Sequence, residues 1–183
     1  MSNTIDQYNT VVEKCKNIFL KKTKDYGTSW RVLRPVSVID QLFIKASRIR
    51  NIQEKKTRLV GDDISSEFIG IVNYGVIGLI QLQLQNPEIE DLPVEKASAL
   101  YDSHIEEVRK LMGEKNHDYG EAWRDMSQES FADLILVKLL RIRQILANDG
   151  KTIISEGIDA NYQDIINYAV FALILIDEGK HNS

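Results

Sequence analysis

Apolar residues recur along the chain with the three-to-four-residue spacing of amphipathic helices. Val11, Cys15 and Ile18 lie on one such stripe, and no segment shows the two-residue alternation that is typical of a strand. Two longer apolar stretches, near residues 69–84 and 165–176, are typical of helices buried in a core. Helices are therefore expected over about residues 5–22, 37–52, 63–84, 94–114, 129–148 and 157–178.

The last three expected helices repeat the first three. An offset of 93 residues places Asp25-Tyr26-Gly27 on Asp118-Tyr119-Gly120 and Trp30-Arg31 on Trp123-Arg124. Across residues 24–50, 11 of the 27 positions are identical, whereas unrelated sequences would give roughly one or two. The sequence therefore predicts an internal duplication.

The duplication predicts how the chain is organised. One half covers residues 1–84, a linker with two prolines covers residues 85–93, and the second half covers residues 94–183. A single half could not bury its apolar third helix well, so both halves are expected to form one compact domain. The predicted fold is an all-α, internally duplicated six-helix bundle with pseudo-two-fold symmetry.

Composition narrows the partners and the cellular setting. Apolar residues make up 43% of the chain and charged residues 27%, which is typical of a globular protein. The net charge of −4 gives no strong sign of direct nucleic-acid binding, and polar interruptions of the apolar stretches argue against a membrane span. A single cysteine and the lack of a signal-peptide pattern favour a cytoplasmic protein. Homo-oligomerisation stays open.

The repeated D-Y-G-x-x-W loop is the first candidate for ligand binding. Its aromatic side chains could stack on a nucleotide base while its aspartate binds an amine or a metal. The alternative is structural: the glycine ends the preceding helix in a left-handed conformation, and the indole anchors the loop to the core. The candidates are Asp25, Tyr26 and Trp30 and their equivalents Asp118, Tyr119 and Trp123.

A pair of cations recurs in the second helix of each half. Lys45 and Arg48 are three residues apart and share a helical face, and Lys138 and Arg141 repeat them. Two cations that project into a cleft suit phosphate oxygens. The alternatives are a solvated basic face or ion pairs with the third helix.

The start of the same helix carries a capping signal. Ser37-x-x-Asp40 and Ser130-x-x-Asp133 both place a hydroxyl three residues before a carboxylate. This pattern favours capping over catalysis for the two aspartates.

Polar residues interrupt the apolar third helix of each half. A buried carboxylate needs a cation or a metal as partner, and oxygen ligands suit Mg²⁺. The alternative is a packing network, with Asn73 against Asn167 across the pseudo-axis or Asp164 paired with Arg141. The interrupting residues are Glu67 and Asn73 in the first half and Asn161, Asp164 and Asn167 in the second.

Taken together, these motifs resemble a known family, nucleotide modification associated domain 1. The resemblance rests on D-Y-G-x-x-W, then K-x-x-R-I, then N-Y-G/A, and it covers nearly the whole chain as two tandem copies. It implies an α-helical domain associated with nucleotide or DNA-base modification. The layout is also similar to all-α nucleotide pyrophosphatases of the MazG and dimeric-dUTPase type, which implies acidic helices and Mg²⁺. Their E-x-x-E and E/D-x-x-D motifs are not recognisable here.

Two hypotheses follow. The sequence contains no Walker, G-x-G-x-x-G or H-E-x-x-H motif that would decide between them. The first hypothesis is a protein that binds a small-molecule nucleotide. In its more specific form, the protein is a Mg²⁺-dependent nucleotide pyrophosphohydrolase with one composite site for metal binding and catalysis. Glu67 and Asp164 would hold the metal in that site, and Lys45, Arg48, Lys138 and Arg141 would hold phosphates. The second is a non-catalytic helical binding or assembly module whose repeated polar residues form a structural network.

Overall fold

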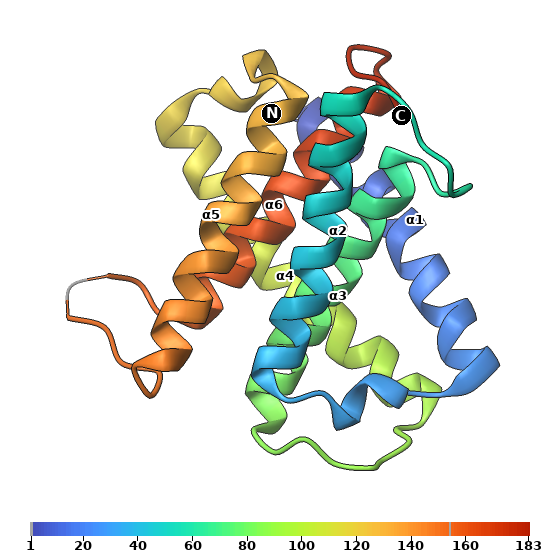
Figure 1. The fold of residues 1–183 in the computed structure, drawn as a ribbon, viewed down its shortest axis with the longest axis vertical. Coiled ribbons are helices and arrows are strands. Elements are labelled where there is room, and N and C mark those ends of the chain that lie inside the picture. Colours follow the sequence, from blue (N-terminus) through green and yellow to red (C-terminus); the bar gives the residue numbers. More distant parts are fainter. Residues whose placement is uncertain (1, 154) are drawn as a thin grey trace.

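The computed structural model describes residues 2–153 and 155–183, and these residues form helices and no strand. The prediction of an all-α fold is confirmed. Each half has three α-helices, with a short 3₁₀ helix after the first (Figure 1). The elements are α1 (Ser2–Tyr26), η1 (Ser29–Val32), α2 (Pro35–Lys55), α3 (Ile64–Leu84), α4 (Val94–Tyr119), η2 (Ala122–Asp125), α5 (Gln128–Ala147) and α6 (Ile158–Asp177).

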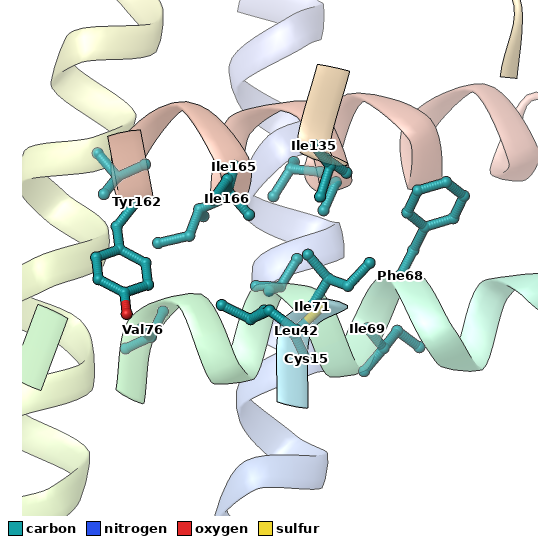
Figure 2. Close-up of a cluster of buried hydrophobic side chains, with 14 of the residues drawn as sticks. Cys15, Leu42, Phe68, Ile69, Ile71, Val76, Ile135, Tyr162, Ile165 and Ile166 are labelled. Atoms are coloured by element: carbon teal, nitrogen blue, oxygen red, sulfur yellow. The ribbon is translucent and has the colours of Figure 1, made fainter. Parts of the chain in front are cut away.

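Four helices form the centre of the molecule. α3 packs on α6, α2 packs on α3, α5 packs on α6, and α2 also contacts α5 (Figure 1). α3 and α6 run antiparallel, because Gly75 faces Ile166 whereas Gly78 faces Tyr162. A Cβ on either glycine would lie within 2.6 Å of these side chains, so glycine permits the close approach. Large apolar side chains fill the remaining space between the two helices (Figure 2).

α1 and α4 pack beside this centre and join the two halves. Each of them contacts both α3 and α6, so each half supplies a helix to the core of the other. By length and composition, α3 is apolar enough to cross a membrane, since an 18-residue stretch of it has a mean hydropathy of 1.3. However, 72% of that stretch is buried inside the fold. It is the buried core helix that its continuous apolar pattern predicts.

A symmetric set of buried hydrogen bonds links the halves. In each half, an asparagine of the third helix accepts a bond from a tyrosine of the other half and donates to a carbonyl of its own first helix. Burial raises the pKa of both tyrosines, so their hydroxyls remain donors. The expected contact between Asn73 and Asn167 is replaced by this arrangement. The bonds run from Tyr101 to Asn73 to the Cys15 carbonyl (2.7 and 3.0 Å) and from Tyr8 to Asn167 to the Val108 carbonyl (2.7 and 3.3 Å).

The predicted capping role of the serine–aspartate pairs is wrong. Ser37 lies inside α2, which begins at Pro35, because proline is well suited to the first helical turn. Ser130 lies inside α5, whose cap is Ser127; the Ser127 hydroxyl accepts a bond from the backbone N–H of Ser130 at 3.2 Å. Proline and the earlier serine therefore start α2 two residues and α5 one residue before the expected positions.

The two aspartates of those pairs instead make ion pairs between the halves. Asp40 of α2 pairs with Arg143 of α5 at 3.2 Å, and Asp133 of α5 pairs with Arg50 of α2 at 3.4 Å. The offset of 93 residues relates the two pairs, so they are one contact made twice across the pseudo-axis. All four side chains are largely exposed, and such pairs each contribute less than about 1 kcal/mol.

The glycine of each D-Y-G loop behaves as predicted. Gly27 follows α1 with a φ of 72°, and Gly120 follows α4 with a φ of 63°. Their backbone N–H groups bond back to Thr23 and Asn116, which closes the last turn of each helix. The aspartate and tyrosine of the motif therefore belong to the helix itself, and both helices run four to five residues beyond the expected ends.

Candidate functional site

A cleft opens in the first half between the end of α1, η1, α2 and α3. Its volume is about 500 Å³, within the range of small-molecule sites. The cleft lies where the first D-Y-G-x-x-W loop meets the second and third helices of the same half. Its polar and aromatic lining includes Lys22, Tyr26, Trp30, Lys45, Glu67 and Tyr74.

Aromatic side chains form the wall and rim of this cleft. Tyr26 is 59% exposed, whereas Trp30 is buried and packs against Phe19 with ring centroids 6.3 Å apart. Tyr74 is half-buried, and this burial raises its pKa. The indole N–H of Trp30 has no hydrogen-bond partner among the described residues, a property it shares with Trp123.

Charged side chains line the α2–α3 side of the cleft. Glu67 is buried and accepts a bond from Arg48 at 2.8 Å, while Lys45 lies 3.7 Å from the other carboxylate oxygen. Arg48 also donates to the backbone carbonyls of Val60 and Asp62, which fixes its guanidinium outside the cleft lining. Of the predicted phosphate-binding pair, Lys45 therefore lines the cleft and Arg48 holds the carboxylate beside it.

The second half has a different arrangement at the equivalent position. Asp164 is buried and makes two ion pairs, with Lys115 of α4 at 2.7 Å and Lys138 of α5 at 2.9 Å. Partial burial lowers the pKa of Lys115, but the hydrogen bond and charge of Asp164 outweigh it and leave the pKa raised. The carboxylate of Asp164 therefore has its cations within the same half, and Arg141 is not its partner.

The aromatic residues of the second half are also packed differently. Trp123 is buried and stacks on Phe171, with ring centroids 4.2 Å apart and planes at 4°. The residue equivalent to Phe171 in the first half is Ile77, which lines the open cleft. The anchoring interpretation therefore describes Trp123 fully, whereas Trp30 is both an anchor and part of a cleft wall.

The expected composite site of Glu67 and Asp164 does not form. The antiparallel register of α3 and α6 places Asp164 level with about residue 77, ten residues along α3 from Glu67. This separation corresponds to about 15 Å along the helix axis. Each carboxylate is neutralised by cations of its own half instead. Among the described residues, no group of three or more His, Cys, Asp or Glu side chains could hold a metal ion.

Several other candidates lie outside the cleft. Asp25 is exposed at the end of α1, and Tyr119, the equivalent of Tyr26, is 74% exposed. Asp118 is also exposed and contacts the ring of His117 at 3.1 Å. Arg141 is exposed and lines a different hollow beside the α5–α6 loop. The repeated sequence positions therefore do not make two equivalent sites.

Sequence reasoning overlooked two pairs of equivalent positions that the repeat could have revealed. Lys22 and Lys115 are related by the same offset of 93 residues. Lys22 lines the cleft of the first half, and Lys115 pairs with Asp164 at the equivalent place in the second half. Arg31 and Arg124 are related in the same way and tie the loops down. Arg31 is 3% exposed and donates to Glu90 at 2.9 Å, while Arg124 donates to acidic groups in the second half.

Comparisons with known proteins place this duplicated fold in a family. The family model for nucleotide modification associated domain 1 matches residues 22–82 and residues 115–176, about two thirds of the chain. Neither curated proteins nor solved structures give a match. The two matches confirm the predicted internal duplication and link the chain to nucleotide modification. The chain belongs to the nucleotide modification associated domain 1 family, as two tandem copies.

Proposed function

We propose that the chain binds a nucleotide in the cleft of its first half. The observation that carries the proposal is a cleft of about 500 Å³ whose lining combines aromatic rings with two lysines. A nucleotide has a flat base and an anionic tail, and this lining offers a stacking surface for one and cations for the other. The family's link to nucleotide modification supports the same ligand class.

The arrangement of the lining favours one orientation of the nucleotide. Tyr26 is the exposed ring at the rim, so it is available to stack on a base. Lys22 and Lys45 line the cleft and suit the phosphates. Trp30 would contribute its ring to the cleft wall.

Hydrolysis of the bound nucleotide is the more specific part of the proposal. Glu67 is the buried carboxylate in the cleft, but Arg48 and Lys45 already neutralise it. Because the described residues form no metal-binding group, Mg²⁺ would arrive mainly as the counterion of the nucleotide phosphates. We therefore assign no catalytic step to a protein-held metal.

Calorimetric titration with deoxynucleoside mono-, di- and triphosphates, each with and without Mg²⁺, tests the proposal. We expect one nucleotide per chain. Tyr26→Ala should weaken binding roughly five-fold or more, because stacking on an aromatic ring contributes about 1–3 kcal/mol per base. Tyr119→Ala is the matched control, since this equivalent tyrosine lies outside the cleft and should leave affinity unchanged.

Failure of every nucleotide to bind would overturn the proposal. Equal losses in Tyr26→Ala and Tyr119→Ala would also overturn it, because the effect would then not come from the cleft. Release of pyrophosphate in the same mixtures would establish the hydrolytic part. Binding without turnover would leave a nucleotide-binding protein and exclude hydrolysis of the nucleotides tested.

A further inference from the structure

The two halves differ at one position that decides whether a single carboxylate bonds to both of their lysines. The second half has Asp164, bonded to Lys115 and Lys138 at 2.7 and 2.9 Å. The first half has Gly70 at the equivalent position, with Lys22 and Lys45 as the equivalent lysines. All three of these first-half residues line the open cleft. The first half therefore keeps the two cations but lacks the carboxylate between them.

We infer that the space beside Gly70 is a subsite for an anionic group of the ligand, and that Asp164 fills the matching subsite of the second half from within. The inference rests on the proposed nucleotide site and specifies where its phosphate lies. Phosphate oxygens between Lys22 and Lys45 take the place that the Asp164 oxygens take between Lys115 and Lys138. The chain then has one open site and one closed by its own side chain.

Helix packing alone does not account for the glycine. A Cβ on Gly70 would lie 2.9 Å from two side-chain carbons of Lys45, and a lysine chain can move to make room. In the second half, α5 packs on α6 with an aspartate at this position, and Lys138 simply bonds to it. An aspartate is therefore compatible with the same helix pair, and glycine has the distinct effect of leaving the cleft open.

Glu67 does not replace the missing carboxylate. Its closest cation is Arg48 at 2.8 Å, and Lys45 is 3.7 Å away, beyond hydrogen-bond distance. The equivalent residue in the second half, Asn161, is uncharged and donates to the carbonyl of Gly157. Lys45 therefore pairs with Glu67 by charge but makes no hydrogen bond to it, which leaves its ammonium donors available to a ligand.

Exchange of the two residues tests the inference. The probe is inorganic triphosphate, titrated calorimetrically at low salt into wild-type, Gly70→Asp, Asp164→Gly and the double variant. Wild-type should bind one triphosphate per chain. Gly70→Asp should weaken binding more than roughly ten-fold, because its carboxylate would occupy both lysines. Asp164→Gly should bind two, and the double variant should bind one, in the second half.

Two further variants separate the subsite from general attraction to lysine. Lys22→Gln should weaken triphosphate binding more than roughly ten-fold, whereas Lys96→Gln, an exposed lysine on α4, should have no effect. Unchanged binding in Gly70→Asp or Lys22→Gln would overturn the inference. Gly70→Asp is decisive even if Asp164→Gly unfolds. Aspartate has at least the helix propensity of glycine, so this variant should fold, and its melting temperature checks that it does.

The outcomes also distinguish the inference from the proposed function. If no nucleotide binds but triphosphate binds and is lost in Gly70→Asp, the anionic subsite stands and the nucleotide proposal fails. If nucleotides bind and Gly70→Asp leaves their affinity unchanged, the nucleotide proposal stands and the subsite is wrong.

Discussion

The two halves share their mutual interface and differ in their clefts. The first half leaves an open cleft beside Gly70 and Ile77. The second half has Asp164 and Phe171 at these positions, one bonded to two lysines and the other stacked on Trp123. The repeated segment therefore forms a ligand-sized cleft in one copy, whereas in the other copy a carboxylate and an aromatic ring occupy the equivalent place.

The shared features are those that join the halves. The tyrosine–asparagine bonds and the aspartate–arginine pairs each occur twice, related by the pseudo-axis. A contact across a pseudo-two-fold axis needs both partners in both halves, which keeps the interface symmetric. The clefts lie away from this axis, so a change in one has no required counterpart in the other.

The largest expected effect concerns the symmetric interface. Asn73→Ala should destabilise the fold by about 3 kcal/mol, because it removes two hydrogen bonds and leaves the buried Tyr101 hydroxyl without an acceptor. Asn167→Ala should cost about the same, since Asn167 plays the same part with Tyr8. Urea unfolding at neutral pH gives both free energies of unfolding.

A double-mutant cycle sharpens this test. Tyr101→Phe combined with Asn73→Ala should cost less than the sum of the single changes, because the second change no longer leaves an unsatisfied group. Costs for Asn73→Ala and Asn167→Ala that differ by more than about 2 kcal/mol would show that the interface is not energetically symmetric, although the same hydrogen bonds occur on both sides of it.

The sequence predicted what its periodicity and its repeat encode. Helical spacing gave the all-α fold and its six helices, and the 93-residue offset gave the two equivalent halves. The expected pairing of Glu67 with Asp164 failed because it depends on the antiparallel register of α3 and α6, which local spacing does not contain. The ion pairs of Asp40 and Asp133 with the other half were missed for the same reason. Their partners lie in the other half, whereas a capping signal can be read locally.

The second prediction concerns the aromatic difference between the halves. Phe171→Ile introduces the residue of the first half and should destabilise the fold by about 1–2 kcal/mol, through loss of the Trp123 stack and of volume. The reverse change, Ile77→Phe, places a ring beside Trp30 in the cleft. It should weaken nucleotide binding roughly ten-fold or more, because the ring takes space from the ligand.

Urea unfolding followed by tryptophan fluorescence measures the first effect, and calorimetric titration measures the second. Ile77→Val is the matched control, since it removes volume from the cleft wall and should leave room for the ligand. If Ile77→Phe binds nucleotide as tightly as the wild-type protein, the open cleft of the first half is not where the ligand lies.

The smallest expected effect concerns the start of the third helices. Asp63 caps α3 by accepting a bond from the Ser66 N–H at 2.8 Å, whereas Gly157 starts α6 without a side-chain cap. Asp63→Ala should cost about 1 kcal/mol at neutral pH, and Gly157→Ser should change stability by only a few tenths. The Ser66 N–H bond is the main reason that the pKa of Asp63 lies below its ordinary value of 3.8.

The pH dependence of this cap separates its charge from its hydrogen bond. Because folding lowers the pKa of Asp63, its ionised form contributes stability above about pH 4, and the contribution disappears as the pH falls through the folded value. The stability difference between wild-type and Asp63→Ala, measured by urea unfolding, should therefore shrink from pH 7 to pH 3. Asp63→Asn keeps an acceptor without a charge, so its difference from Asp63→Ala should stay constant with pH. A wild-type advantage that persists unchanged at pH 3 would show that hydrogen bonding alone makes the start of α3 differ from that of α6.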